Sequence, residues 1–156
     1  MKDWILRINL LVFIVLTVCY LYQVVYVAVV LFKRNKQKQN LPCIFHRYGV
    51  LIAARNESMV IGNLIRSIQN QTYPGKLVDI FVVADNCTDD TAGIARQLGA
   101  KVYERFNKQE VGKGYALDFA FRRIAQDYGN DYYDAFFVFD ADNLLDPHYI
   151  DEMNAV

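Results

Sequence analysis

The sequence has few cysteines, which limits the classes of protein it can belong to. Only three of its 156 residues are cysteine, and no two of them form a C-x-x-C pair. Cys19 lies inside a long apolar stretch, which leaves Cys43 and Cys87. This number is too small for the dense disulfide framework of a small secreted domain, and it suits a reducing compartment.

Several catalytic patterns are also missing. The two histidines, His46 and His148, have no partner at metal-binding spacing, and we interpret both as structural. No Ser-His-Asp or Cys-His arrangement is visible, and the eleven tyrosines are spread along the chain without indicating a site. The G-K-G around Lys113 lacks the Walker A pattern, and no G-x-G-x-x-G follows the first predicted strand, which disfavours dinucleotide binding.

The net charge of zero hides an uneven distribution. Residues 1–38 carry six basic residues and one acidic residue, whereas residues 39–156 carry eleven basic and sixteen acidic residues. Nonspecific binding to nucleic acid needs a basic face, so the acidic second part excludes nucleic acid as an expected partner. The basic run at 33–38 is better placed to contact anionic lipid headgroups of a membrane.

The first part of the chain is dominated by one long hydrophobic run. Residues 8–32 contain no formal charge, and only Asn9, Thr17 and Gln23 are clearly polar. A helix of that length spans roughly 37 Å, enough to cross a hydrocarbon core of about 30 Å. The alternatives are a cleaved signal peptide, whose apolar region is shorter, and a buried core helix, which normally shows a polar face. The pattern favours a membrane span.

Flanking charges predict the orientation of this span. Four basic residues follow it within 33–38, whereas Lys2 and Arg7 precede it. The excess of positive charge after the span favours a cytoplasmic location for the rest of the chain, at the cell membrane. We therefore predict an anchor at 1–33, a polar basic linker at 34–41 and a globular domain at 42–156.

The globular part alternates between strand and helix patterns. Four apolar runs are typical of buried strands, and they cover 48–54, 78–84, 101–104 and 133–139. Helical spacing of apolar residues is found at 61–68, about 90–98 and about 115–127, with a further helix starting near 146. This alternation predicts an α/β fold, a parallel sheet with helices on both faces.

Capping residues predict where the helices begin and end. Asn56 is expected to cap the helix after the first strand, and Thr88 or Asp89 the helix after the second. Gly99 is expected to end that second helix, because glycine adopts the left-handed conformation found after helix C-termini.

Polar residues follow every predicted strand. They comprise 54–57, 85–90, 104–107 with 111–114, and 140–143. The carboxyl ends of parallel strands meet at one edge of the sheet, and open α/β sheets bind their ligands there. The sequence therefore predicts one site built from these four segments.

Asp140 and Asp142 are the most informative pair in that set. Residues i and i+2 leaving a strand point the same way, so the two carboxylates converge. Mg²⁺ binds through one or two protein carboxylates, with water and substrate phosphates completing its shell. The alternative is a solvated Asx-type turn closed by Asn143.

Three further side chains have both a functional and a structural interpretation. Asp85 can accept a hydrogen bond from a base N–H or a ribose hydroxyl, or it can cap the next helix. Lys113 can reach a phosphate, or it can be a surface lysine in a loop between two glycines. Glu57 can contact a ligand, or it can stabilise the helix N-terminus beside it.

Four segments together resemble a known family. They read VLIAARNESMVIGNLIRSIQNQTYP, DIFVVADNCTDDTAGIAR, GKGYALDFAF and FFVFDADNLLDPHYI. In this order and spacing they resemble the nucleotide-sugar-binding half of family 2 glycosyltransferases, which have the Rossmann-like GT-A fold. The likeness covers about residues 48–153. With the N-terminal span, the chain resembles membrane-bound members that assemble polysaccharides.

The resemblance implies roles for the loop after the first strand and for the acid after the second. Residues 53–57, beginning at Ala53, match the loop that cups uracil and ribose, with Arg55 and Glu57 as the contacts. Asp85 matches the acid that hydrogen-bonds the nucleoside base. Many members have two consecutive acids there, whereas this chain has Ala84 before Asp85, so one acidic contact is missing.

The remaining site residues are implied in the same way. Lys113 matches the residue beside the diphosphate. Asp140, Ala141 and Asp142 match the D-x-D motif, whose two acids hold Mg²⁺ or Mn²⁺ on the diphosphate. The implied donor is a nucleoside diphosphate sugar, with a UDP-sugar favoured, and the acceptor is a glycan or a lipid-linked molecule. The implied reaction inverts the anomeric carbon.

The resemblance also implies elements that these 156 residues lack. The family's general base and its Q-x-x-R-W motif lie well beyond the D-x-D pair, so the base is expected beyond residue 156. We expect a C-terminally truncated form that binds a sugar nucleotide and transfers sugar poorly. One alternative is a non-catalytic binding or membrane-assembly module. Another is a phosphotransferase of the haloacid-dehalogenase type, whose first strand resembles F-V-F-D-A-D.

Overall fold

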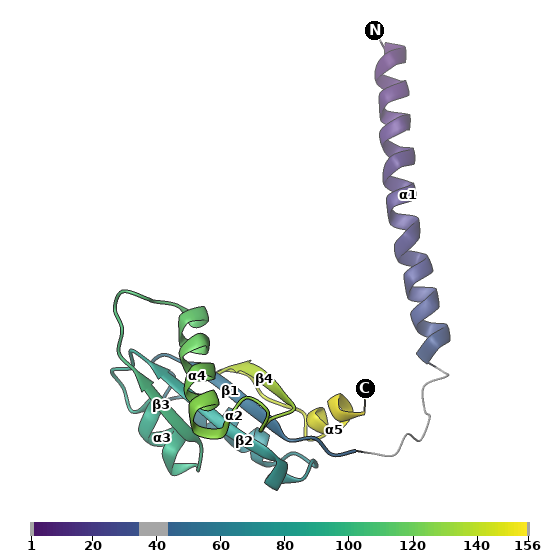
Figure 1. Ribbon diagram of the computed structural model, residues 1–156. Coiled ribbons are helices and arrows are strands. Elements are labelled where there is room, and N and C mark those ends of the chain that lie inside the picture. Colours follow the sequence, from purple (N-terminus) through teal and green to yellow (C-terminus); the bar gives the residue numbers. More distant parts are fainter. Residues whose placement is uncertain (1, 35–43, 156) are drawn as a thin grey trace. The chain divides into compact units, whose positions relative to one another are not determined.

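The computed structural model describes residues 2–34 and 44–155, which form two units (Figure 1). The first is the helix α1, Lys2–Arg34, and the second is an α/β domain. Within α1, residues 4–32 are long and apolar enough to cross a membrane, and the most apolar part has no buried side chains. The predicted linker at 34–41 lies outside the described residues, apart from Arg34 at the end of α1.

Four parallel strands form the sheet of the second unit. They are β1 (Tyr48–Ala54), β2 (Val78–Asp85), β3 (Lys101–Arg105) and β4 (Ala135–Asp140). Their order is β3-β2-β1-β4, so β1 lies between β2 and β4. All three pairings are parallel. The predicted α/β fold is confirmed, and each strand lies within two residues of its predicted position.

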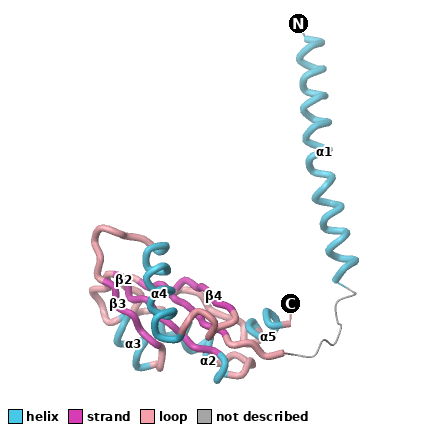
Figure 2. Tube along the Cα trace, in the orientation of Figure 1, coloured by secondary structure: helices cyan, strands magenta, loops and turns pink. Residues whose placement is uncertain are grey.

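Helices cover both faces of the sheet (Figure 2). They are α2 (Ile61–Gln69), α3 (Thr91–Gln97), α4 (Lys113–Tyr128) and the short α5 (Tyr149–Asn154), with a 3₁₀ turn η1 at Gly75–Leu77. The cluster that includes α2 and α3 buries Val50 and Ile52 of β1, whereas the cluster that includes α4 buries Leu51. Alternate residues of β1 therefore pack on opposite faces, as expected for a strand between two helical layers.

Two of the predicted helix caps are wrong. The N-cap of α2 is Val60, without a side-chain hydrogen bond, because Asn56 adopts a left-handed φ of 56° and accepts a bond from the β2–α3 loop instead. The N-cap of α3 is Asp90, not Thr88 or Asp89. Asp89 still accepts the N–H of Thr91, the first residue of α3, at 3.1 Å.

The predicted end of α3 is confirmed. Gly99 follows the C-cap Leu98 with a φ of 83°. Its N–H donates to the carbonyl of Arg96 at 2.9 Å, and the N–H of Ala100 donates to that of Ala95 at 3.0 Å. These two bonds form a Schellman motif, which satisfies carbonyls that the helix end would leave without partners.

Several tyrosines gather in space although they are spread along the sequence. Phe81 of β2 is fully buried, with the rings of Tyr103, Tyr128 and Tyr133 centred 6.1, 5.7 and 5.6 Å from its own. The hydroxyl of Tyr133 donates to Asp79 at 2.7 Å. These residues belong to the core between the sheet and α4, so our sequence interpretation of the tyrosines overlooked their structural role.

Candidate functional site

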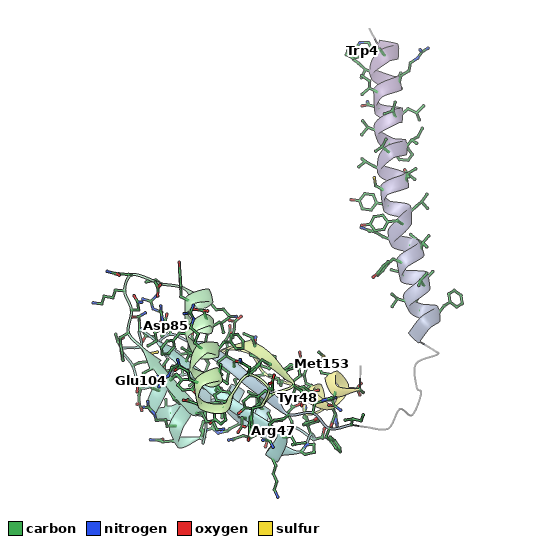
Figure 3. The ribbon with its side chains drawn as sticks, viewed as in Figure 1. Trp4, Arg47, Tyr48, Asp85, Glu104 and Met153 are labelled. Atoms are coloured by element: carbon green, nitrogen blue, oxygen red, sulfur yellow. The ribbon has the colours of Figure 1, made fainter. Side chains whose placement is uncertain are left out.

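A pocket of about 190 Å³ opens where β1, β2 and β4 end. It is lined by Ala53, Ala54, Arg55, Glu57, Asp85, Gly112, Lys113, Ala116 and Asp140. Six of the eight predicted site residues are in this lining. Figure 3 shows Asp85 at this end of the sheet, away from Arg47 and Tyr48 at the opposite end.

The strand order brings the two acids of the pocket together. Ala53 of β1 pairs with Val83 of β2 on one side and with Asp140 of β4 on the other. Asp85 lies two residues beyond Val83, at the end of β2. The acids therefore flank the end of β1, where the small side chain of Ala53 leaves room between them.

The other two predicted residues lie outside the pocket lining. Ala141 is 4% exposed and belongs to the core on the α2 side of the sheet, whereas Asp142 is exposed. Asn143 Oδ1 accepts the N–H of Asp140 at 3.0 Å, and the N–H of Asn143 donates to the carbonyl of Asp140 at 3.1 Å. A turn closed by Asn143 is therefore present, but it is a β-turn and not the Asx-type turn considered from the sequence, because Asn143 bonds to the residue three positions before it. The carboxylates of Asp140 and Asp142 stay exposed.

The carboxylates of Asp140 and Asp142 are too few to hold a metal ion by themselves. Among the described residues, no three His, Cys, Asp or Glu side chains are grouped so that they could hold a metal ion. Mg²⁺ and Mn²⁺ accept carboxylate oxygens, and Mg²⁺ sites commonly use one or two of them, with water and phosphate oxygens as the other ligands. Two carboxylates supply only part of such a shell, so a metal held by Asp140 and Asp142 would need water or phosphate oxygens as its other ligands.

Asp85 has a buried partner that sequence reasoning missed. Arg105 Nη1 donates to Asp85 Oδ1 at 2.7 Å, and the side chains are only 5% and 7% exposed. Asn86 Nδ2 donates to the same oxygen at 3.1 Å. Because these bonds use Oδ1, the other oxygen is the one left for a ligand. The register of β2 and β3 places Arg105 directly beside Asp85.

Lys113 faces Asp140 across the pocket. Its Nζ lies 2.6 Å from Asp140 Oδ1, and the two side chains are 46% and 62% exposed. Exposed ion pairs contribute only about 0–1 kcal/mol, so an incoming anion or cation can readily replace this pairing. Lys113 is the first residue of α4 rather than a loop residue, and its ammonium lies beside the acid of β4.

Glu57 does not stabilise the start of α2 as considered from the sequence. The first turn of α2 contains no acidic residue, because the helix begins four residues later at Ile61. The backbone N–H of Glu57 donates to Thr91 Oγ1 at 2.9 Å, and its carbonyl accepts the N–H groups of Val60 and Ile61. With its backbone fixed in this way, Glu57 lines the pocket.

A second network joins the β1–α2 and β2–α3 loops. Asn56 Oδ1 accepts the N–H of Thr88 at 2.7 Å, and Asp89 Oδ2 accepts the N–H of Ser58 at 3.0 Å. Cys87 Sγ lies 3.4 Å from the nitrogen of Asn56. These residues hold Arg55 and Glu57 at the pocket. The sequence indicates this network only through the number of short polar side chains in the two loops, which is larger than the helix caps require.

The hydrogen bonds to Asp89 give the domain a specific acid sensitivity. The hydroxyl of Thr91 is the main cause that lowers the pKa of Asp89 from 3.8 to about 2; desolvation opposes this shift, and hydrogen bonds from Ser58 and from the backbone of Thr91 add to it. A lowered native pKa stabilises the fold above pH 4, and this contribution is lost as the pH falls toward 2.

We expect Asp89→Asn to flatten the dependence of the free energy of unfolding on pH between about 4 and 2, by up to one proton. Urea unfolding of wild type and variant at pH 5, 4, 3 and 2.5 measures this change. Asp131→Asn is the control, because Asp131 is an exposed acid in the loop before β4. Parallel curves for wild type and Asp89→Asn would contradict the prediction.

Comparison with known proteins assigns this arrangement to a family. The model of the family described as "Glycosyltransferase like family 2" matches residues 46–156, which is most of the chain. The chain belongs to this glycosyltransferase family. The match agrees with the resemblance found in the sequence, and it leaves the haloacid-dehalogenase alternative without support.

Two curated relatives of this family 2 chain come from Staphylococcus aureus. Both are 4,4'-diaponeurosporenoate glycosyltransferases. The protein of strain N315 is 36% identical over 92 residues, which cover 58% of this chain and 24% of the relative. The protein of strain USA300 is 41% identical over 71 residues, covering 46% and 18%. The aligned part of this chain thus spans about a quarter of the relatives' length, or less.

Solved structures of glycosyltransferases share the fold of this family 2 chain. Residues 1–349 of S. aureus TarS superimpose with a TM-score of 0.56 at 18% identity, over 70% of this chain and 31% of TarS. A mannosyltransferase from Pyrobaculum calidifontis, solved with GDP-Man and Mn²⁺, gives a TM-score of 0.54 at 24% identity, over 72% and 33%. At these identities the likeness concerns the fold, which is GT-A.

Proposed function

We propose that this chain binds a nucleoside diphosphate sugar in the pocket at the ends of β1, β2 and β4, as the donor-binding part of a membrane-anchored, inverting glycosyltransferase. The observation that carries the proposal is the convergence of Asp85 and Asp140 on one pocket that also contains Lys113. These groups match the parts of such a donor. Asp85 suits the nucleobase or ribose, Lys113 the diphosphate, and Asp140 a metal bound to the diphosphate.

The nucleoside occupies the side of the pocket formed by β1 and β2. Asp85 accepts a hydrogen bond from the base through the oxygen that Arg105 leaves available. Arg55 and Glu57 contact the base and ribose, and Ala53 provides the space beneath them. A UDP-sugar is the favoured donor. Two of the structural neighbours support a nucleotide donor, since TarS was solved with UDP and with UDP-GlcNAc.

The diphosphate lies between Lys113 and the acids after β4. Asp140 and Asp142 would hold Mg²⁺ or Mn²⁺, with Ala141 between them packed in the core. When bound, the metal neutralises charge on the departing diphosphate. The Lys113 ammonium exchanges its partner, from Asp140 to a phosphate oxygen of the ligand.

The remaining parts of the reaction are expected from the family. The acceptor is a glycan or a lipid-linked molecule whose hydroxyl attacks the anomeric carbon, and the general base is expected beyond residue 156. The helix α1 anchors the enzyme in the cell membrane, and the basic residues after the span favour a cytoplasmic domain.

Titration with labelled UDP in the presence of Mg²⁺ or Mn²⁺ tests the proposal. We expect Asp142→Ala to weaken metal-dependent binding by about tenfold to a hundredfold, because a charged ligand contact of roughly 1.5–3 kcal/mol is lost. Binding without metal should change little. Asp131→Ala removes an exposed acid from the opposite end of the sheet and should bind like wild type. Equal affinities for wild type and Asp142→Ala would contradict the proposed metal site.

A measurement of sugar transfer to an acceptor distinguishes an enzyme from a binding module. Incubation of the chain with a radiolabelled UDP-sugar and a membrane extract, followed by extraction of glycans and lipids, measures transfer directly. Binding without transfer would assign this chain the donor-binding role alone.

A further inference from the structure

Arg105 reaches from the acid of β2 to the loop that leads to Lys113. Its Nη1 donates to Asp85 Oδ1 at 2.7 Å, and its Nη2 donates to the carbonyl oxygen of Glu110 at 2.8 Å. Nη2 also lies 3.3 Å from Glu110 Oε2. Glu110 precedes Lys113 by three residues. One buried side chain therefore connects the two parts of the pocket.

The loop before α4 has its own frame, centred on Asn107. Asn107 Oδ1 accepts the N–H groups of Gln109 and Glu110 at 2.9 and 3.1 Å. Asn107 Nδ2 donates to Glu110 Oε2 at 3.0 Å. An asparagine that bonds to the backbone after it defines a fixed turn. The carboxylate of Glu110 receives bonds from both Asn107 and Arg105, so it joins this turn to the buried arginine.

Asn86 fastens the same loop to the end of β2. The N–H of Asn107 donates to Asn86 Oδ1 at 2.9 Å, and Asn86 Nδ2 donates to the carbonyl of Asn107 at 3.0 Å. Asn86 has a left-handed φ of 53°, a conformation that asparagine tolerates better than most residues. The start of the loop is held by this reciprocal pair and its end by Glu110.

Gly112 connects the loop to α4. Its φ of 132° is a conformation that residues with a side chain rarely adopt, and its carbonyl accepts the N–H of Ala116 at 3.2 Å. Lys113 follows as the first residue of α4. Only Val111 and Gly112 separate Glu110 from this lysine, so a displacement of Glu110 is transmitted to Lys113.

We infer that Glu110 is a positioning residue, which sets the place of Lys113 relative to Asp85 through Arg105. This inference rests on the proposed function, in which Asp85 contacts the nucleoside and Lys113 the diphosphate. Loss of the Glu110 carboxylate removes its bonds from Asn107 and Arg105 and leaves the end of the loop held only by the backbone bonds of Glu110, while Asp85 keeps Arg105 and Asn86 as partners. Glu110 therefore governs binding of the diphosphate and leaves binding of the nucleoside unchanged.

The charge of Glu110 makes the expected effect distinctive. Removal of a negative charge near an anionic ligand would by itself strengthen binding. Loss of the charge therefore cannot explain a weaker affinity for UDP, whereas loss of the hydrogen bonds can. Glu110→Gln removes the charge but keeps an oxygen that accepts from Arg105 and Asn107, whereas Glu110→Ala removes both the charge and the acceptor.

The experiment measures the affinities of the full 156-residue chain in detergent for UDP with Mg²⁺ and for uridine, the latter by competition with labelled UDP. We expect Glu110→Ala to weaken UDP binding by about fivefold to tenfold and uridine binding by less than about twofold. Glu110→Gln should bind UDP at least as well as wild type. Gln109→Ala is the matched control in the same loop, and thermal unfolding checks that each variant is folded.

The outcomes separate this inference from the proposed function. If wild type binds UDP and Glu110→Ala binds it equally well, the inference fails alone. The same holds if UDP and uridine weaken together, because Glu110 would then act on the whole fold. If wild type binds no UDP, the proposed function fails and the inference fails with it.

Discussion

Arg105→Ala is expected to lower the free energy of unfolding by about 3–5 kcal/mol, because it leaves a buried carboxylate without its cation. The Asp85 side chain is only 7% exposed, so water compensates little for the lost guanidinium. The variant also loses the bond to the carbonyl of Glu110. Urea unfolding of the chain in detergent, followed by circular dichroism of the α/β domain, measures the loss.

Two further variants test the stated cause. Arg122→Ala removes an arginine of an exposed i,i+4 pair with Asp118, whose side chains are 76% and 60% exposed, and it should cost less than about 0.5 kcal/mol. Asp85→Asn in the Arg105→Ala background should recover part of the loss, because the buried group is then neutral. A loss below about 1 kcal/mol for Arg105→Ala would show that water compensates for the missing guanidinium.

Phe81→Ala is expected to destabilise the domain by about 3–5 kcal/mol, because it removes a fully buried ring and leaves a cavity. Phe81 is 0% exposed, and the rings of Tyr103, Tyr128 and Tyr133 surround it. Lys101 Nζ lies 5.3 Å from the centre of its ring, which adds a cation–π contact. Thermal and urea unfolding give the change in stability.

An exposed ring provides the comparison for this variant. Phe106 is 71% exposed, so Phe106→Ala should change the free energy of unfolding by less than about 0.5 kcal/mol. Phe81→Leu should lie between wild type and Phe81→Ala, since it fills part of the space. If Phe81→Ala and Phe106→Ala cost the same, the aromatic cluster contributes little to stability.

The main geometry of the pocket could be predicted because it follows from strand direction. Asp85 and Asp140 end strands that run parallel to β1, and parallel strands all end at the same edge. Lys113 and Glu57 follow strands of the same sheet and so reach the same pocket. None of this requires the positions of individual side chains.

The predicted caps of α2 and α3 were wrong because short polar side chains have more than one possible hydrogen-bond partner nearby. Asn56 and Thr88 both had the chemistry of helix caps, but they bond to each other across two loops. A short polar side chain can accept either the N–H of its own helix or one from a neighbouring loop. The sequence shows the capacity for both, and only the distance between the loops selects one.

What the sequence determined by itself is the pattern of strands and helices, the apolar N-terminal helix and the set of polar residues at the strand ends, because these depend on local periodicity and chain direction. The tertiary structure decided that Arg105 neutralises Asp85, that Ala141 is buried and that Glu110 is tied to Arg105. These contacts depend on the order β3-β2-β1-β4 and on strand register. Strand order and register are fixed by packing between residues that are far apart in the chain. Local periodicity in the sequence carries no information about such packing.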